Sequence, residues 1–463
     1  MAASSSPSRS PFSGQRVWRA GTLTYTTAGL VALFAWLLWG DFAWWLKERS
    51  VVPVAQLFLK KFEATDMIVG LLVGSLPAAL GMVLGPIVSV RSDRHRGRWG
   101  RRIPYLLIPT PIAALSMVGL AFTPRLGALL HAWLGARSPG ESACVLISFG
   151  LFWTVFEIAS VVANAVLGGL INDVVPQEVI GRFFGLFRAV SLAAGVVFNF
   201  WLMGHAEEYA FWIFGGVGVI YGGGFTLMCL RVKEGEYPPP PPATGDGASV
   251  LKDFAAGAVA YARECFANSH YLWIFAATTL AMISFGPVNT FGVFYAKSVG
   301  MSMDAYGKYL SLVFTISFVM SFFLGWLADL LHPLRLGIIS IALYGAMALW
   351  AGLAADDARS FAVAFVAHGV LSGVYFTATA SIGQRLYPRE KFAQFASAAG
   401  LVAAGGFAVL PPLMGRYLDL TGHVYRHTFL AGAGLAFLAF GALLVVHRRW
   451  MALGGPKGYV APG

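Results

Sequence analysis

Twelve apolar segments, each long enough to cross a lipid bilayer, run through this sequence of 463 residues. A membrane-spanning helix needs about 20 mostly apolar residues, because the hydrocarbon core of a bilayer is about 30 Å thick. The segments are continuous and do not alternate in polarity at every second residue, which indicates helices and not a barrel. The predicted spans are residues 20–40, 67–90, 103–122, 144–172, 183–204, 209–230, 271–296, 309–328, 336–355, 360–384, 395–415 and 428–446.

The composition agrees with this interpretation, since only 12% of the residues are charged, against about 25% in soluble domains. A water-exposed surface on a chain of this length needs more charge, so a soluble enzyme is excluded. The sequence also lacks a phosphate-binding glycine loop with its lysine, paired histidines at metal spacing and a nucleophile elbow. We therefore expect an all-α membrane protein that is not an enzyme and holds no cofactor and no metal.

The basic residues are distributed unevenly between the predicted loops. About two thirds of the 33 Lys and Arg residues fall in the two termini and in the loops after spans 2, 4, 6, 8 and 10. Because basic residues concentrate on the cytoplasmic side, both termini are predicted to be cytoplasmic, in the inner cell membrane. This orientation explains the net charge of +11, so we expect membrane lipid and not nucleic acid as a partner. Residues 1–21 lack the apolar core of a signal peptide.

The two halves of the chain resemble one another at equivalent loops. An aspartate follows both span 2 and span 8, and a Pro-x-Glu pattern follows both span 4 (residues 176–178) and span 10 (residues 388–390). Such pairs indicate a duplicated six-helix unit. The predicted organisation is a cytoplasmic tail (1–19), a six-helix bundle (20–230), a cytoplasmic linker with a proline run and an amphipathic helix (231–268), a second six-helix bundle (269–447) and a cytoplasmic tail (448–463).

The loop after span 2 carries a recognisable motif. The segment Pro86-Ile-Val-Ser-Val-Arg-Ser-Asp-Arg94 is followed by a short basic insert and then by Gly100-Arg-Arg-Ile-Pro104. This pattern resembles the loop signature of the major facilitator superfamily, and more narrowly that of the sucrose-type and glycoside–pentoside–hexuronide sugar:cation symporters. Ser89 stands where the superfamily has its first loop glycine. The resemblance implies twelve helices in two pseudo-symmetric bundles, with helices 1, 4, 7 and 10 lining a central cavity.

The resemblance also implies a conformational latch. Contacts between the arginines of this loop and a carboxylate at the end of span 4 would lock one state of the transport cycle and break in the other. The alternative is that the arginines only orient the protein in the membrane. The residues assigned to the latch are Asp93, Arg94, Arg101, Arg102, Asp173, Gly325 and Asp329.

Polar residues inside the spans indicate where a substrate binds, because they are costly unless they face a bundle interior or a wet cavity. Such residues share single helical faces on spans 4, 5 and 10. Hydroxyl and amide groups beside tryptophan rings suit a sugar, whose apolar faces stack on the rings. The substrate-binding candidates are Trp44, Trp45, Asn164, Arg188, Asn289 and Tyr375. An interfacial aromatic belt for the tryptophans and interhelical hydrogen bonds for the asparagines remain alternatives.

Three ionisable residues are candidates for coupling a cation to transport: Glu157, Asp41 and His368. Glu157 lies in the apolar span 4, where burial disfavours the charged carboxylate and allows it to carry a proton. The alternative is a permanent ion pair between Glu157 and Arg188 on the next helix. Histidine titrates near neutral pH, so His368 either relays protons or is a satisfied interior side chain.

The place of Asp41 depends on where the first helix ends. If the helix ends near Leu46, Asp41 lies close to the outer surface and residues 47–49 form a plain outer loop, which is the interpretation we favour. If the helix runs on to Pro53, Asp41 lies deep in the membrane. Lys47, Glu48 and Arg49 would then enter the cavity wall, where such a charged triplet favours an acidic sugar.

These features predict a monomeric secondary active transporter that moves a sugar or glycoside together with protons or sodium by alternating access. A facilitator or exporter of another small molecule uses the same fold, as does a non-transporting membrane assembly factor or sensor. The sequence leaves the substrate, the coupling cation and the direction of transport open, because a shift of one helical turn changes which side chains meet a ligand.

Overall fold

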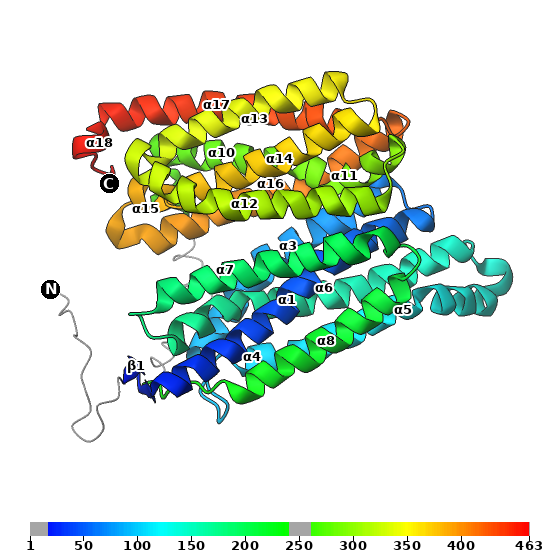
Figure 1. Ribbon diagram of the computed structural model, residues 1–463, viewed down its shortest axis with the longest axis horizontal. Coiled ribbons are helices and arrows are strands. Elements are labelled where there is room, and N and C mark those ends of the chain that lie inside the picture. Colours follow the sequence, from blue (N-terminus) through cyan, green and yellow to red (C-terminus); the bar gives the residue numbers. More distant parts are fainter. Residues whose placement is uncertain (1–16, 240–260, 463) are drawn as a thin grey trace. The chain divides into compact units, whose positions relative to one another are not determined.

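The computed structural model describes residues 17–239 and 261–462 of the chain, and most of these residues are helical (Figure 1). The last prolines of the proline run, residues 240–242, and residues 249–260 of the predicted amphipathic helix lie outside these ranges. Residues 261–266, the end of that predicted helix, are helical. The described chain forms two compact units, one of residues 17–63, 80–198 and 205–239, and one of residues 64–79, 199–204 and 261–462.

The first unit is a bundle of long helices preceded by a two-stranded antiparallel hairpin, which the sequence analysis did not predict. Within it α1 packs on α7 and α8, and α5 packs on α6 and α8. Its elements are β1 (Trp18–Ala20), β2 (Leu23–Tyr25), α1 (Thr27–Lys61), α3 (Leu76–Arg94), α4 (Pro104–Leu107), α5 (Pro109–Leu134), the 3-10 turn η2 (Gly135–Arg137), α6 (Glu141–Val174), α7 (Ile180–Val197) and α8 (Ala210–Arg231).

The second unit contains the helices of the C-terminal half, together with two short pieces from the N-terminal half. Within it α17 packs on α10 and α13, α14 packs on α12 and α13, and α16 packs on α2 and η1. Its elements are α2 (Asp66–Val69), η1 (Gly70–Ser75), η3 (Phe198–Leu202), η4 (Met203–His205), α10 (Ser269–Ser284), α11 (Gly286–Ser298), α12 (Met303–Leu331), α13 (Pro333–Ala354), α14 (Ala358–Thr379), α15 (Ile382–Leu386), η5 (Arg389–Lys391), α16 (Phe392–Leu420), α17 (His427–Ala452) and α18 (Gly455–Gly458).

The predicted spans correspond to helices of the structure. In the described ranges, eleven helical segments are long and apolar enough to cross a membrane. The 29-residue helix α12 occupies the place of the predicted eighth span. Span 7 is divided into α10 and α11 at Phe285, directly before Gly286 and Pro287, because Pro287 has no N–H to continue the helical ladder.

The first helix is much longer than we expected. It begins behind Thr26, whose hydroxyl accepts a hydrogen bond from the Gly29 N–H at 3.1 Å, and it continues through Pro53 to Lys61. The favoured interpretation of residues 47–49 as an outer loop is therefore wrong. A proline inside a membrane helix is tolerated, because neighbouring helices and local adjustments satisfy the freed backbone groups. Consequently Asp41 and the charged triplet 47–49 lie in the middle of α1.

Candidate functional site

A lysine with no solvent exposure lies in the middle of α1, where this helix meets α6 and α8. The Nζ atom of Lys47 is 2.6 Å from Glu48 Oε1 and 3.1 Å from the hydroxyl oxygen of Ser160 on α6, and the Lys47 side chain is 0% exposed. A buried ammonium group is stabilised only when its three donors find acceptors or electron-rich rings. The carboxylate and the hydroxyl supply two of these interactions.

Aromatic rings surround the rest of the Lys47 ammonium group. The Nζ atom is 3.9 Å from the ring centroid of Trp44, 5.2 Å from that of Phe156 and 5.3 Å from that of Tyr221. Cations over ring faces are attracted by the ring quadrupole, most strongly at a tryptophan. Trp44 is itself 5% exposed and packs against Tyr221 and Phe225 of α8. In this structure Trp44 therefore packs against the lysine and does not belong to an aromatic belt at the membrane interface.

Glu157 lies next to this lysine site, one turn before Ser160 on α6. Its side chain is 7% exposed, and it is close enough to Lys47 and Glu48 to experience both charges. No ion pair between Glu157 and Arg188 occurs in the part of the chain that the structure describes, and Arg188 is exposed. The permanent pair that the sequence left open is thus absent here, and the neighbouring cation of Glu157 is Lys47.

Asp41 is the most deeply buried acid on α1. It is 1% exposed, and within the described ranges neither of its carboxylate oxygens has a hydrogen-bond partner. The indole N–H of Trp45, one turn further along α1, is nearby but also lacks a partner of hydrogen-bonding geometry. A carboxylate without partners is costly as an ion in this position. Asp41 is therefore suited to hold a proton or a small cation.

The guanidinium groups of Arg49, the last residue of the charged triplet, and of Arg188 are close enough to interact. Arg49 stacks over the ring of Trp45 at 4.9 Å from its centroid, and it experiences the charge of Arg188 on α7 as well as that of Glu48. The first unit thus gathers acids and bases from α1, α6 and α7 in the middle of membrane helices. Asn164, one turn beyond Ser160 on α6, is exposed in this unit.

In the second unit, His368 on α14 is 2% exposed and bound at both ring nitrogens. Nε2 is 3.1 Å from Asn289 Oδ1 on α11, and Nδ1 is 3.1 Å from the Tyr344 hydroxyl on α13. The Tyr344 hydroxyl is also 3.3 Å from the carbonyl oxygen of Ser284, at the end of α10. Because an amide oxygen only accepts, Nε2 carries a proton, and Nδ1 accepts from Tyr344 when the ring is neutral.

The Tyr344 hydroxyl makes this network compatible with either charge state of the histidine. When Nδ1 is also protonated, it can donate to the tyrosine oxygen, and the hydroxyl proton then turns to the Ser284 carbonyl. Tyr375, two turns further along the same face of α14, is 2% exposed, and its hydroxyl lacks a partner within the described residues. These groups join α14 to the break between α10 and α11.

The loop between α3 and α4 forms a compact ion-pair network with the end of α6. Asp173 accepts from Arg101 at 2.8 Å and from Arg102 at 2.6 Å, and the carboxylate of Asp93 lies 2.9 Å from Arg102. The Glu234 carboxylate accepts from the backbone N–H groups of Arg101, Arg102 and Ile103. Both arginines are thereby held by side chain and backbone.

The remaining residues assigned to the latch are not part of this network as described. Arg94 is exposed and, within the described ranges, makes no ion pair with Asp173, because it ends α3 outside the turn that carries Arg101 and Arg102. Gly325 and Asp329 lie on α12, and their surroundings are outside what the structure describes. Gly100, between the basic insert and the two arginines, has φ +97°, a conformation that favours glycine.

Comparison with known proteins identifies the family. A family model described as MFS/sugar transport protein, where MFS denotes the major facilitator superfamily, matches residues 38–387. The chain belongs to this family. No protein among those with curated functions matches the chain.

Solved structures confirm the twelve-helix fold of the superfamily. A bacterial homologue of the human lysosomal transporter Spinster, inward-facing and unoccupied, is 16% identical with a TM-score of 0.66, covering 91% of this chain and 98% of that chain. The nucleoside transporter NupG is 12% identical (TM-score 0.64; 89% and 98% covered), and a D-xylose-proton symporter is 14% identical (TM-score 0.58; 89% and 96%). Likeness at these identities shows the fold alone.

Sequence analysis missed a second polar cluster, at the start of α2. The buried Asp66 carboxylate is 2.6 Å from His423 Nδ1 and 3.2 Å from the Tyr425 hydroxyl, while Asp419 accepts from the backbone N–H groups of Asp66 and Met67. The available signal was the acid directly after Thr65, since an acidic first turn is typical of a helix start. The partners of Asp66 lie more than 350 positions away in the sequence, so no local pattern connects them to it.

Proposed function

We propose that this family member is a cation-coupled symporter of a sugar or glycoside, in which Glu157 carries the coupling proton. The coarser statement, that the chain has the fold and family of a major facilitator transporter, does not depend on this assignment. The proposal concerns the ion, the substrate class and the residues that serve them.

The observation that carries the proposal is one buried lysine beside two carboxylates. Buried charges are tolerated when they are paired, and the Lys47 ammonium group is already 2.6 Å from Glu48. A negative charge on Glu157 would then have no cation of its own within the lysine site. Glu157 is therefore best accommodated as the neutral acid in this state. It can release its proton when the surroundings change, and Lys47 is the group that can turn to it.

Asp41 and His368 also support the coupling of a cation to transport. Asp41 is buried with both oxygens free of partners within the described residues, so it is a second position for a proton or sodium. His368 is held in a network that accepts either protonation state, so it can follow the cycle without leaving a buried donor unpaired. We assign Glu157 the coupling role, because of the three candidates only Glu157 lies near Lys47, which is already paired with Glu48.

A sugar is the substrate class that the polar and aromatic groups favour. Aromatic rings and hydroxyl or amide groups suit a polyol. In the first unit the ring candidates are Trp45 and, once Lys47 moves away, Trp44. In the second unit, taken by itself, the polar candidates are Asn289 and Tyr375. Arg188, which has no ion pair to Glu157, is available to a substrate oxygen. The cluster around Asp173 would serve as the latch, because its ion pairs join a loop to a helix end and can form and break as a unit.

The test is a counterflow screen of monosaccharides and disaccharides with the purified chain in proteoliposomes. We expect one sugar or glycoside to exchange across the membrane, and an inwardly directed proton gradient to drive its accumulation. Exchange without any response to proton or sodium gradients would favour a facilitator. An absence of exchange for every sugar, with exchange of another solute class, would refute the proposed substrate.

A further inference from the structure

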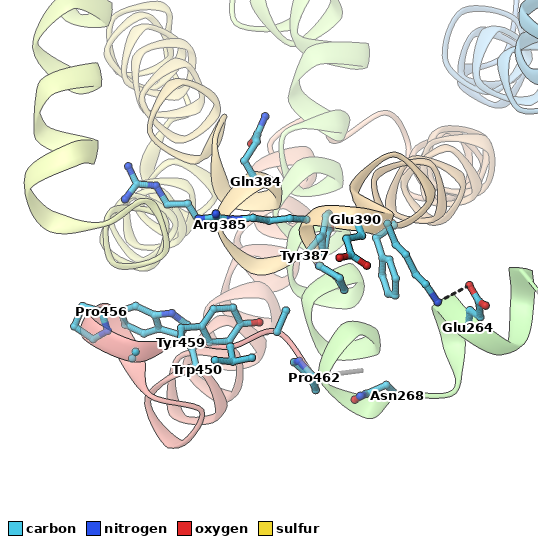
Figure 2. A pocket seen from close by; sticks show the side chains of 18 of the residues that line it. Glu264, Asn268, Gln384, Arg385, Tyr387, Glu390, Trp450, Pro456, Tyr459 and Pro462 are labelled. Carbon is cyan, nitrogen blue, oxygen red and sulfur yellow. Dashed lines mark ion pairs between the residues drawn. The ribbon is translucent and has the colours of Figure 1, made fainter. Parts of the chain in front are cut away.

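A cavity of about 980 Å³ lies within the second unit, at the ends of its membrane helices and apart from the buried networks described above. It is lined by the turn at residues 263–268, His332 before α13, residues 384–391 from α15 to η5, Phe395 of α16, Trp450 of α17 and the C-terminal residues 455–462. Figure 2 shows Trp450 and Tyr459 on one side and Tyr387 and Glu390 on the other. The cavity therefore depends on the C-terminal tail for one of its walls.

Hydrogen bonds hold this tail in place. The Tyr459 hydroxyl donates to the carbonyl oxygen of Leu386 at 2.8 Å and lies 3.0 Å from His270 Nε2. The Tyr271 hydroxyl donates to the carbonyl oxygen of Pro462 at 2.5 Å. A tail fixed at both Tyr459 and Pro462 forms a stable wall, so the cavity belongs to the folded structure.

The lining is basic. Four cations, Arg263, Arg385, Arg389 and Lys391, face two acids, Glu264 and Glu390, among the lining residues. Arg335 adds to the positive potential near the cavity, because its guanidinium carbon lies 5.8 Å from the ring centroid of Trp450. Clustered like charges repel one another unless an anion joins them.

One of the two acids is already engaged. Glu264 accepts from the Gln394 amide at 2.9 Å and pairs with Lys391 at 3.2 Å, which Figure 2 marks by a dashed line. The hydrogen bond from Gln394 and then the ammonium group of Lys391 lower the pKa of Glu264. Arg263 and Arg389 form no ion pair in the described part of the chain, and both are exposed. Two guanidinium groups are thus available to a ligand.

His332 forms an aromatic part of the cavity wall, and the nearby arginines act on it. It stacks on Trp450 with 4.4 Å between ring centroids. Burial lowers the pKa of His332 to about 4, and the charges of Arg385, Arg335 and His447 add to that effect. At neutral pH the ring is therefore uncharged, and it forms an aromatic wall together with Trp450.

We propose that this cavity binds a phosphate group, held by Arg263 and Arg389 between the C-terminal tail and the segment 384–391. Planar guanidinium groups bind phosphate oxygens through paired, charge-assisted hydrogen bonds. The cavity lies where α10 and α13 begin and α17 ends, which is the depth of lipid headgroups. The phosphate belongs either to an anionic phospholipid or to a soluble phosphate compound. The site is independent of the sugar and of the coupling cation.

The experiment compares the two sources with the full-length chain in nanodiscs. The reference nanodiscs contain digalactosyldiacylglycerol, a bilayer lipid without phosphate, and inorganic pyrophosphate is titrated into them. Separate nanodiscs contain added phosphatidylglycerol without pyrophosphate. The melting temperature of the protein is measured in each case, with sodium chloride of matched ionic strength as the reference. The variant Arg263→Gln/Arg389→Gln removes the two available cations, and Arg263→Lys/Arg389→Lys keeps the charge without the planar fork. Arg359→Gln is the matched control, since Arg359 is an exposed arginine of the same unit outside the cavity.

We expect phosphate to raise the melting temperature of the wild-type chain and of Arg359→Gln. Each arginine replaced by glutamine should weaken binding about tenfold, because a hydrogen bond to a charged group is lost, and the lysine variant should fall in between. A response to pyrophosphate assigns the site to a soluble phosphate compound, and a response only to phosphatidylglycerol assigns it to lipid. An equal response of the glutamine variant, or no response of the wild-type chain to either source, would overturn the proposal.

Discussion

The substitution Glu157→Gln separates coupling from transport. Glutamine has the shape of the protonated acid but cannot release a proton, so the substrate should still cross the membrane while the proton gradient no longer drives it. Lys47 is paired with Glu48 at 2.6 Å, and the proposal assigns the coupling role to Glu157 alone, so we predict one proton per cycle. For one proton, a gradient of one pH unit is equivalent to about 1.4 kcal/mol. The wild-type chain should therefore accumulate its substrate about tenfold at that gradient.

The assay is uptake of radiolabelled substrate into proteoliposomes, with a pH gradient of one unit and with none. Glu157→Gln should show counterflow close to that of the wild-type chain and no accumulation. The control is Glu141→Gln, an exposed acid in the first turn of the same helix, which should accumulate like the wild-type chain. Accumulation by Glu157→Gln that equals the wild-type value would refute the coupling assignment. Loss of counterflow as well would mean that Glu157 binds substrate.

Two further predictions concern stability, measured as heat unfolding of the purified chain, and a third concerns the yield of folded protein. Asp173→Asn should lower the free energy of unfolding by about 2 kcal/mol, because it removes charge-assisted hydrogen bonds to Arg101 and Arg102 and leaves Arg102 with Asp93 alone. Asp93→Asn, at a side chain 54% exposed, should cost less than about 1 kcal/mol. Tyr425→Phe should cost about 1 kcal/mol, because one hydrogen bond to the buried Asp66 is lost, and an unchanged melting temperature would contradict that bond. Gly307→Ala should reduce the yield of folded protein, because its Cβ atom would collide with a backbone oxygen, and a normal yield would show that this approach is looser.

The sequence predicted the parts of the fold that depend on local composition. The length and position of an apolar run determine whether a segment crosses the membrane, and this requirement is independent of the partners of the segment. This length requirement predicts the eleven described helical segments that can cross a membrane, and it also predicts the position of α12. The basic loop between α3 and α4 was also recognisable from its local motif, whereas its ion pairs join residues 72 and 71 positions apart in the sequence.

The tertiary structure decided which of the charged residues meet. Whether Lys47 belongs to a loop or to a helix could not be decided locally, because Pro53 permits a helix only when neighbouring helices satisfy the freed backbone groups. One partner of Lys47 is a serine 113 positions away, and one partner of Asp66 is a histidine 357 positions away. The rotation and packing of whole helices bring such pairs together. The apolar runs that become membrane helices were thus encoded along the chain, whereas the pairing of buried charges was set only when the helices packed.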